Sequence, residues 1–184
     1  MEDLSLHILD IVQNSISAEA DTVSLFITED LQNDRLIIIV VDNGRGMDEE
    51  TAKKVVDPFY TTRTTRKVGL GLPLLNAAAE ACDGFLSIDS QPGKGARVEA
   101  QFSLGHIDRP PLGSTIDTMI TLLVCNPNVD FVYEHSTNEG KFLFDTRLVR
   151  GEIPDIPLDN PDVLEWIREY LFEGLNEISG GVEG

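Results

Sequence analysis

The chain has 184 residues, 41% of them hydrophobic, which is enough for one large domain or for one domain with a small addition. Its 32 acidic residues outnumber 14 basic ones, and the net charge of -18 opposes binding to nucleic acid and to anionic lipid. The longest apolar run, residues 36–41, is far shorter than the ~20 residues that span a bilayer. Since no signal peptide follows Met1, we expect a cytoplasmic protein without membrane insertion.

The first predicted element is an amphipathic helix over residues 4–16. Its apolar residues recur at three- and four-residue spacing, which is typical of a helix with one buried face. The other face carries a polar stripe of His7, Asp10, Asn14 and Ser17. Because helical residues four apart lie one turn from each other, Asp10 and Asn14 are predicted neighbours.

Hydrophobic patterning and turn residues predict the next elements up to residue 104. In chain order they are strands at 22–28 and 35–41, a short helix at 48–58, a polar loop at 61–67, an Ala-rich helix at 69–82, and strands at 85–90 and 96–104. Helices that alternate with hairpins in this way predict an α+β fold. We expect helices on one face of a mixed, mostly antiparallel sheet.

A second, smaller unit is predicted after a proline-rich linker at residues 105–113. Its expected elements are a helix at 114–125, a hairpin of 129–135 and 141–149, and a helix at 161–178. This α-β-β-α unit over 114–178 is too small for much independent stability, so we expect it to pack on the first domain or on a partner. Residues 179–184 are predicted to be a disordered tail.

Four motifs stand in a fixed order along the first domain. They are the helical Asn14, Asp42-x-Gly44-x-Gly46 after a strand, the Pro-Phe-Tyr-Thr-Thr run at 58–62, and Gly69-Leu-Gly-Leu at the start of a helix. Each alone is common in ordinary turns and helices. Together they resemble the N, G1, F and G2 boxes of the GHKL superfamily, which comprises gyrase, Hsp90, histidine kinases and MutL. The resemblance covers residues 1–104 and implies a Bergerat-type α/β sandwich with a histidine-kinase-like ATP-binding domain.

The resemblance implies a site for ATP and Mg²⁺. The carboxamide oxygen of Asn14 would bind the metal, which prefers oxygen ligands and keeps several waters. Asp42 would accept a hydrogen bond from the adenine amino group. Gly44 and Gly46 would let the backbone approach the base, and Met47 would form an apolar wall.

The glycine-rich segment before the Ala-rich helix would bind the phosphates. Backbone N–H groups of Val68, Gly69, Leu70, Gly71 and Leu72 would face them at a helix N-terminus, which favours negative charge. Arg66 and Lys67 either add charged contacts or are solvated loop residues. The stretch from Phe59 to Gly69 would act as a lid over the nucleotide.

Three positions bear on catalysis. Asp10 lies where many relatives carry the glutamate that activates water or the acceptor, so it is a candidate general base, or else a structural residue or a ligand of a Mg²⁺-bound water. Ser17 stands where histidine kinases often have a lysine. Ala96 stands where the family usually has a threonine that helps to hold adenine. Both departures lower the expectation of kinase activity and of tight nucleotide binding.

Three functions remain open for such a protein. It is a nucleotide-dependent regulatory module or subunit of a larger complex, a protein kinase of the anti-sigma or histidine-kinase type that phosphorylates a separate partner, or an ATPase driven by dimerisation. The expected partners are ATP and one or more proteins, with a homodimer left open. The chain also resembles short bacterial ATP-binding proteins associated with multisubunit redox enzymes, which implies a partner of that kind. The three histidines, His7, His106 and His135, lack metal-site spacing and are interpreted as surface or packing residues.

Overall fold

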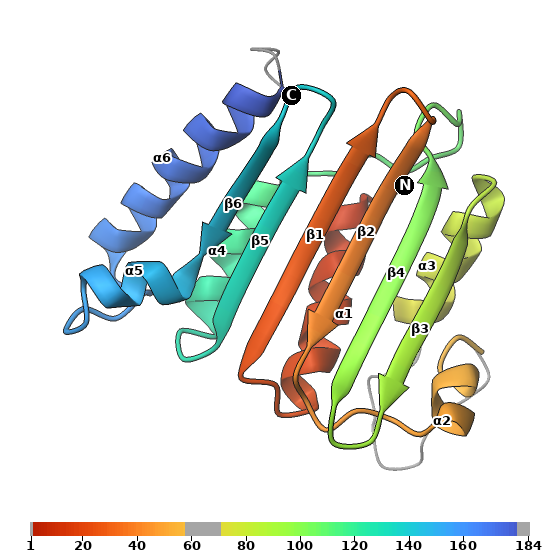
Figure 1. Cartoon of the computed structure of the whole chain (residues 1–184), viewed down its shortest axis with the longest axis horizontal. Coiled ribbons are helices and arrows are strands. Elements are labelled where there is room, and N and C mark those ends of the chain that lie inside the picture. The colour runs from red at the N-terminus through yellow and green to blue at the C-terminus, as the bar shows by residue number, and fades with distance from the viewer. Residues whose placement is uncertain (1, 58–70, 180–184) are drawn as a thin grey trace.

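The computed structural model describes residues 2–57 and 71–179, which form a layer of helices on one six-stranded sheet (Figure 1). The strand order is β3-β4-β2-β1-β5-β6, and every neighbouring pair is antiparallel except β1 with β5. The expected class, helices on one face of a mixed and mostly antiparallel sheet, is therefore confirmed.

The elements have the following bounds. The strands are β1 (Thr22–Asp30), β2 (Arg35–Asp42), β3 (Phe85–Gln91), β4 (Gly95–Ser103), β5 (Asp130–Ser136) and β6 (Lys141–Asp145). The helices are α1 (Leu4–Ser17), α2 (Glu49–Lys54), α3 (Gly71–Ala81), α4 (Thr115–Cys125), α5 (Thr146–Glu152) and α6 (Pro161–Ile178).

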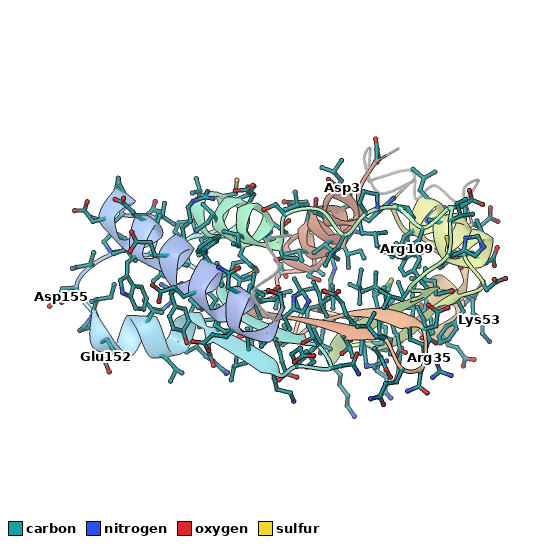
Figure 2. The ribbon with its side chains drawn as sticks, turned by 90° about the horizontal axis from the view of Figure 1, so that it is seen from above. Asp3, Arg35, Lys53, Arg109, Glu152 and Asp155 are labelled. Atoms are coloured by element: carbon teal, nitrogen blue, oxygen red, sulfur yellow. The ribbon has the colours of Figure 1, made fainter. Side chains whose placement is uncertain are left out.

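The core lies between the sheet and the helices α1, α3 and α4, which cover the same face when the molecule is seen from above (Figure 2). Alternate residues of the central strands point into it, for example Val23, Leu25 and Ile27 of β1. From the helical side, Leu4 and Ile8 of α1 are fully buried. Burying one such aliphatic side chain contributes roughly 1.5–3 kcal/mol, so the matched periods of strand and helix hold the two layers together.

The sheet continues across the segment 105–113 that was expected to be a linker. Residues 22–28 of β1 pair in parallel with residues 130–136 of β5, and helix α4 packs beside α1. The crossover passes the start of α1, where the Leu4 backbone N–H donates to the Pro111 carbonyl oxygen at 2.8 Å. The C-terminal elements thus extend the first sheet and share its hydrophobic core.

The expected strand 141–149 is wrong in its second half. Strand β6 ends at Asp145, and helix α5 begins at Thr146. The Asp145 carboxylate accepts a hydrogen bond from the Arg147 backbone N–H at 2.9 Å, which is the geometry of a helix N-cap. The Thr146 hydroxyl is buried and accepts from the Phe131 backbone N–H at 2.9 Å. An N-cap and a buried hydroxyl therefore end the strand where the apolar pattern alone predicted that it would continue.

His7, assigned to the polar stripe of the first helix, is buried, so the solvent-facing stripe is narrower than predicted. The polar loop expected at 61–67 and most of the expected tail lie outside the described residues. The Asp48 carboxylate accepts a hydrogen bond from the Thr51 backbone N–H at 2.7 Å, which is the geometry of a helix N-cap and starts α2.

Candidate functional site

Asp42 lies at the end of β2, where two hydrogen bonds fix its carboxylate. The Ser15 hydroxyl donates to one oxygen at 2.6 Å, and the Gly44 backbone N–H donates to the other at 2.9 Å. Ser15 is buried on α1, directly after Asn14 in the chain. A carboxylate accepts about four hydrogen bonds, so Asp42 keeps acceptor capacity for a further donor.

Ser15 was missed in the sequence analysis. The one feature of the sequence that could have pointed to Ser15 is its position next to Asn14. A serine inside a helix, however, usually forms a hydrogen bond with the backbone of its own helix, and the Ser15 hydroxyl also lies 3.4 Å from the Ile11 carbonyl oxygen. Only the packing of α1 against the end of β2 brings its hydroxyl to Asp42.

The glycines after β2 are required by neighbouring backbone. A Cβ atom at Gly44 would lie 2.7 Å from the Ala18 carbonyl oxygen, which also accepts from the Arg45 backbone N–H at 2.9 Å. Gly46 has a positive φ of 70°, and a Cβ there would lie 2.0 Å from the Gln91 carbonyl oxygen. Both glycines thus allow the loop to pack between the end of α1 and the β3–β4 turn. That the backbone at Gly44 and Gly46 also approaches the adenine base of a nucleotide stays a prediction.

The β3–β4 turn supports the same loop from the other side. The Met47 backbone N–H donates to the Ser90 hydroxyl at 2.8 Å, and that hydroxyl donates to the Gly95 carbonyl oxygen at 2.8 Å. On β4, Ala96 is the register partner of Asp42. The residue that departs from the family pattern is therefore placed directly across from the carboxylate, where its methyl group offers no hydrogen bond.

Helices α1 and α3 bring two further predicted residues together. Gly71 begins α3, and a Cβ atom placed there would lie 3.1 Å from the Asp10 Cβ and 3.4 Å from an Asp10 carboxylate oxygen. Asp10 is exposed on α1, one turn before Asn14, whereas Leu72 points into the core and is buried. The half-buried Asn14 carboxamide has no hydrogen-bond partner in the part of the chain that the structure describes.

The structure thus places eight of the predicted site residues on α1, at the end of β2 and in the loop after it, and at the start of α3; they are Asp10, Asn14, Asp42, Gly44, Gly46, Met47, Gly71 and Leu72. The other predicted site residues lie outside the described residues; they are Phe59, Arg66, Lys67, Val68, Gly69 and Leu70. Within residues 2–57 and 71–179, no group of three or more His, Cys, Asp or Glu side chains could hold a metal ion.

A model of the protein family described as histidine kinase-, DNA gyrase B-, and HSP90-like ATPase matches residues 2–106. The chain belongs to this family. The GHKL resemblance that the four motifs carried is therefore confirmed, and it covers more than half of the chain. The ATPase domain of this family is shared with the histidine kinases.

Curated relatives are similar over the same domain. Sporulation kinase E of Bacillus subtilis is 35% identical over 88 residues, which are 47% of this chain and 12% of the kinase. Sporulation kinase C of the same organism is 34% identical over 88 residues, which are 48% of this chain and 20% of the kinase. The likeness covers only this small share of each kinase, so it extends to one domain.

A solved structure shows the same fold. The N-terminal domain of a DNA repair protein matches with a TM-score of 0.52 and 18% sequence identity, over 78% of this chain and 52% of that one. At this identity the likeness concerns the fold alone. None of the described helices is both long enough and apolar enough to cross a membrane.

Proposed function

We propose that this protein binds ATP with Mg²⁺ and acts as a nucleotide-dependent regulatory module or as a subunit of a larger complex. The observation that carries the proposal is the geometry of Asp42. Its carboxylate is held by the Ser15 hydroxyl and the Gly44 backbone N–H, and it keeps free acceptor sites. A fixed acceptor of this kind suits the exocyclic amino group of adenine and rejects the carbonyl group that guanine carries there.

Asn14 would be the protein ligand of the metal ion. Its carboxamide oxygen has no partner within the described residues, and Mg²⁺ binds through one or two protein oxygens, several waters and the substrate phosphates. Bound there, the ion would neutralise phosphate charge. Asn14→Ala should therefore weaken the Mg²⁺ dependence of nucleotide binding.

The phosphates would lie at the start of α3. Helix N-termini present unpaired backbone N–H groups and a partial positive charge, and Gly71 at this terminus leaves room beside Asp10. The roles assigned to residues 66–70 and to the lid belong to this proposal as well.

Isothermal titration with Asp42→Asn tests the site. We expect ATP affinity to fall by at least about tenfold, since a hydrogen bond to a charged group contributes roughly 1.5–3 kcal/mol and the amide can present a donor to the adenine amine. Asp89→Asn, which removes an exposed carboxylate from β3, is the matched control and should bind ATP as the wild type does. Equal ATP affinity in Asp42→Asn and wild type would refute the adenine assignment.

The contact between Asp10 and Gly71 favours a second candidate, phosphoryl transfer to a partner protein or to water. A general base must lie within hydrogen-bond reach of the attacking oxygen, directly or through one water, and Asp10 lies at the helix end where the phosphates would bind. Incubation with γ-labelled ATP separates the candidates. Label transferred to a partner protein would support a kinase, and steady release of phosphate would support an ATPase. Asp10→Asn should abolish either activity. ATP that stays bound and intact would support the regulatory module.

A further inference from the structure

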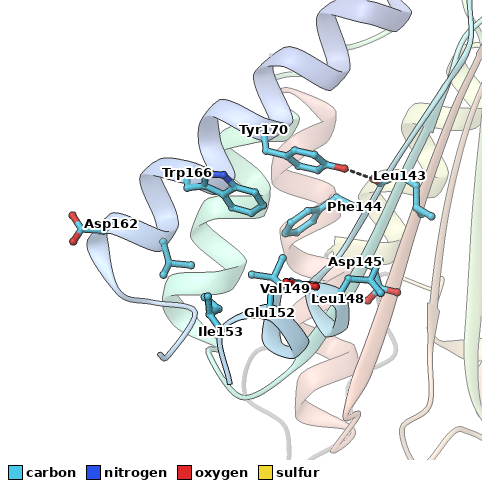
Figure 3. A pocket seen from close by; sticks show the side chains of 11 residues that line it. Leu143, Phe144, Asp145, Leu148, Val149, Glu152, Ile153, Asp162, Trp166 and Tyr170 are labelled. Atoms are coloured by element: carbon cyan, nitrogen blue, oxygen red, sulfur yellow. Dashed lines mark hydrogen bonds between the residues drawn. The ribbon is translucent and has the colours of Figure 1, made fainter. Parts of the chain in front are cut away.

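Exposed apolar side chains gather at the β6 edge of the sheet. Leu148 is 69% exposed, Trp166 52%, Leu143 48% and Tyr170 40%. Between α5, α6 and β6 they border a cavity of about 610 Å³, here called the α5–α6 groove (Figure 3). Its floor and walls include Phe144, Leu148, Val149, Ile153, Trp166 and Tyr170.

The aromatic wall of the groove is held in place by its own contacts. The Trp166 and Tyr170 rings stack at 5.5 Å with an interplanar angle of 12°, and Phe144 lies 6.2 Å from Tyr170. The Tyr170 hydroxyl donates to the Leu143 carbonyl oxygen at 3.4 Å, which ties α6 to the edge strand. Preorganised aromatic side chains around a recess are the usual anchors of protein recognition.

The rim of the groove is acidic. Glu152 and Asp162 line it, and Glu165 and Glu169 follow on α6. None of these four carboxylates has an ion-pair partner among the described residues. The nearby basic side chains are already paired, Arg147 with Asp145 at 2.8 Å, Arg150 with Asp130 at 2.8 Å and Arg168 with Asp117 at 2.7 Å.

We propose that the α5–α6 groove docks a basic amphipathic segment of a partner protein. Large apolar side chains of that segment would fill the groove beside Trp166 and Leu148, while its Lys or Arg side chains would meet Glu152 and Asp162. A groove with an apolar floor and a charged rim is typical of sites that bind an amphipathic helix of a partner. A second copy fits poorly, because two acidic rims and two chains of net charge -18 would face each other.

This inference goes beyond the proposed function and does not depend on ATP. The groove lies at the β6 edge, whereas the candidate nucleotide site lies at α1, α3 and the end of β2. Nucleotide binding and peptide binding can therefore be measured separately on the same chain, and failure of one leaves the other standing.

Binding to the groove can be followed by the fluorescence emission of Trp166, since it is the only tryptophan in the chain. Three synthetic peptides of about 16 residues would be titrated against the full chain: a basic amphipathic helix, a scrambled peptide of the same composition, and a version with Glu in place of Lys and Arg. We expect a blue shift of Trp166 emission and protection from quenching with the first peptide only. Higher salt should weaken its binding, because the rim contacts are exposed.

Leu148→Glu should weaken binding of the basic amphipathic peptide by about tenfold or more, since it places a charge in the apolar groove. Ile107→Glu is the matched control, because Ile107 is 93% exposed and lies outside the groove, and it should bind as the wild type does. ATP titration and circular dichroism of both variants would show that the fold is kept.

The proposal is overturned if no peptide shifts Trp166, if the scrambled or acidic peptide binds equally well, or if Leu148→Glu binds as the wild type does. A concentration-dependent Trp166 shift with dimer formation in sedimentation would assign the groove to a second copy and also overturn it.

Discussion

Two glycines that share a positive φ have different surroundings. Gly46 has φ 70° and Gly93 has φ 78°, so both adopt a region that disfavours other residues by roughly 1–2 kcal/mol. A Cβ atom at Gly46 would collide with the Gln91 carbonyl oxygen at 2.0 Å, whereas one at Gly93 would meet nothing within 4 Å. At this scale the candidate site depends on close backbone packing as much as on its polar side chains.

Alanine substitutions at Gly46 and Gly93 distinguish the cost of a strained backbone conformation from the cost of a steric clash. Gly93→Ala should cost about 1 kcal/mol of unfolding free energy, since only the backbone conformation is strained. Gly46→Ala should cost about 1–3 kcal/mol more, because the loop must also move away from the β3–β4 turn. Urea unfolding measures both values, and equal losses in the two variants would contradict the packing described for the loop.

A chain of polar contacts links the parallel strands β1 and β5. The Tyr133 hydroxyl lies 2.6 Å from His135 Nδ1, and His135 Nε2 lies 2.6 Å from a Glu29 carboxylate oxygen. Burial raises the pKa of Tyr133, so its hydroxyl keeps its proton. The hydrogen bond from His135 lowers the pKa of Glu29 below its ordinary value of 4.5. The connection therefore depends on an ionised Glu29.

Because the contact between β1 and β5 depends on an ionised Glu29, its contribution to the stability of the fold should depend on pH. Because the Glu29 pKa is lower in the folded chain than in the unfolded chain, its contribution to stability is present above about pH 4.5. The contribution is lost as the pH falls through the folded-state pKa. Glu29→Gln should thus be less stable than the wild type at pH 7, and the difference should shrink below pH 4.5 in urea unfolding. Glu139→Gln, in the β5–β6 turn, is the control, and a pH-independent difference for Glu29→Gln would be the contrary result.

On the scale of the whole molecule, the sheet and core span both segments of the chain. β5 pairs with β1 over seven register positions, and core residues from α4, β5, β6 and α6 belong to the same cluster as those of α1 and β2. The family model ends at residue 106, so the C-terminal elements are an addition that completes one edge of a family domain. Without them β1 would become an edge strand with unpaired backbone groups.

A chain cut after Gly113 should therefore unfold without a cooperative transition or aggregate, since it exposes the β1 edge and the apolar surface that α4 covers. A chain cut after Ser179 keeps every described element and serves as the control. Thermal melting by circular dichroism together with size-exclusion chromatography checks both. A monomeric, cooperatively folded chain ending at Gly113 would show that the first domain is independent.

The sequence by itself determined the family, the class of fold and most of the local elements; the exception is the strand expected to run through residues 146–149, where α5 begins. The order of Asn14, Asp42-x-Gly44-x-Gly46 and Gly69-Leu-Gly identified the family, and the periodicity of residues 161–178 predicted α6 with its observed bounds. These features are local, because helical period, caps and glycine turns depend on residues close together in the chain.

Only the tertiary structure decided which distant residues meet. The bond from Ser15 to Asp42, the contact of Asp10 with Gly71 and the parallel pairing of β5 with β1 join segments far apart in sequence. No pattern along the chain encodes them. They result from the packing of all helices on one sheet, where the free energy of burying the whole core selects the register and the neighbours of each element.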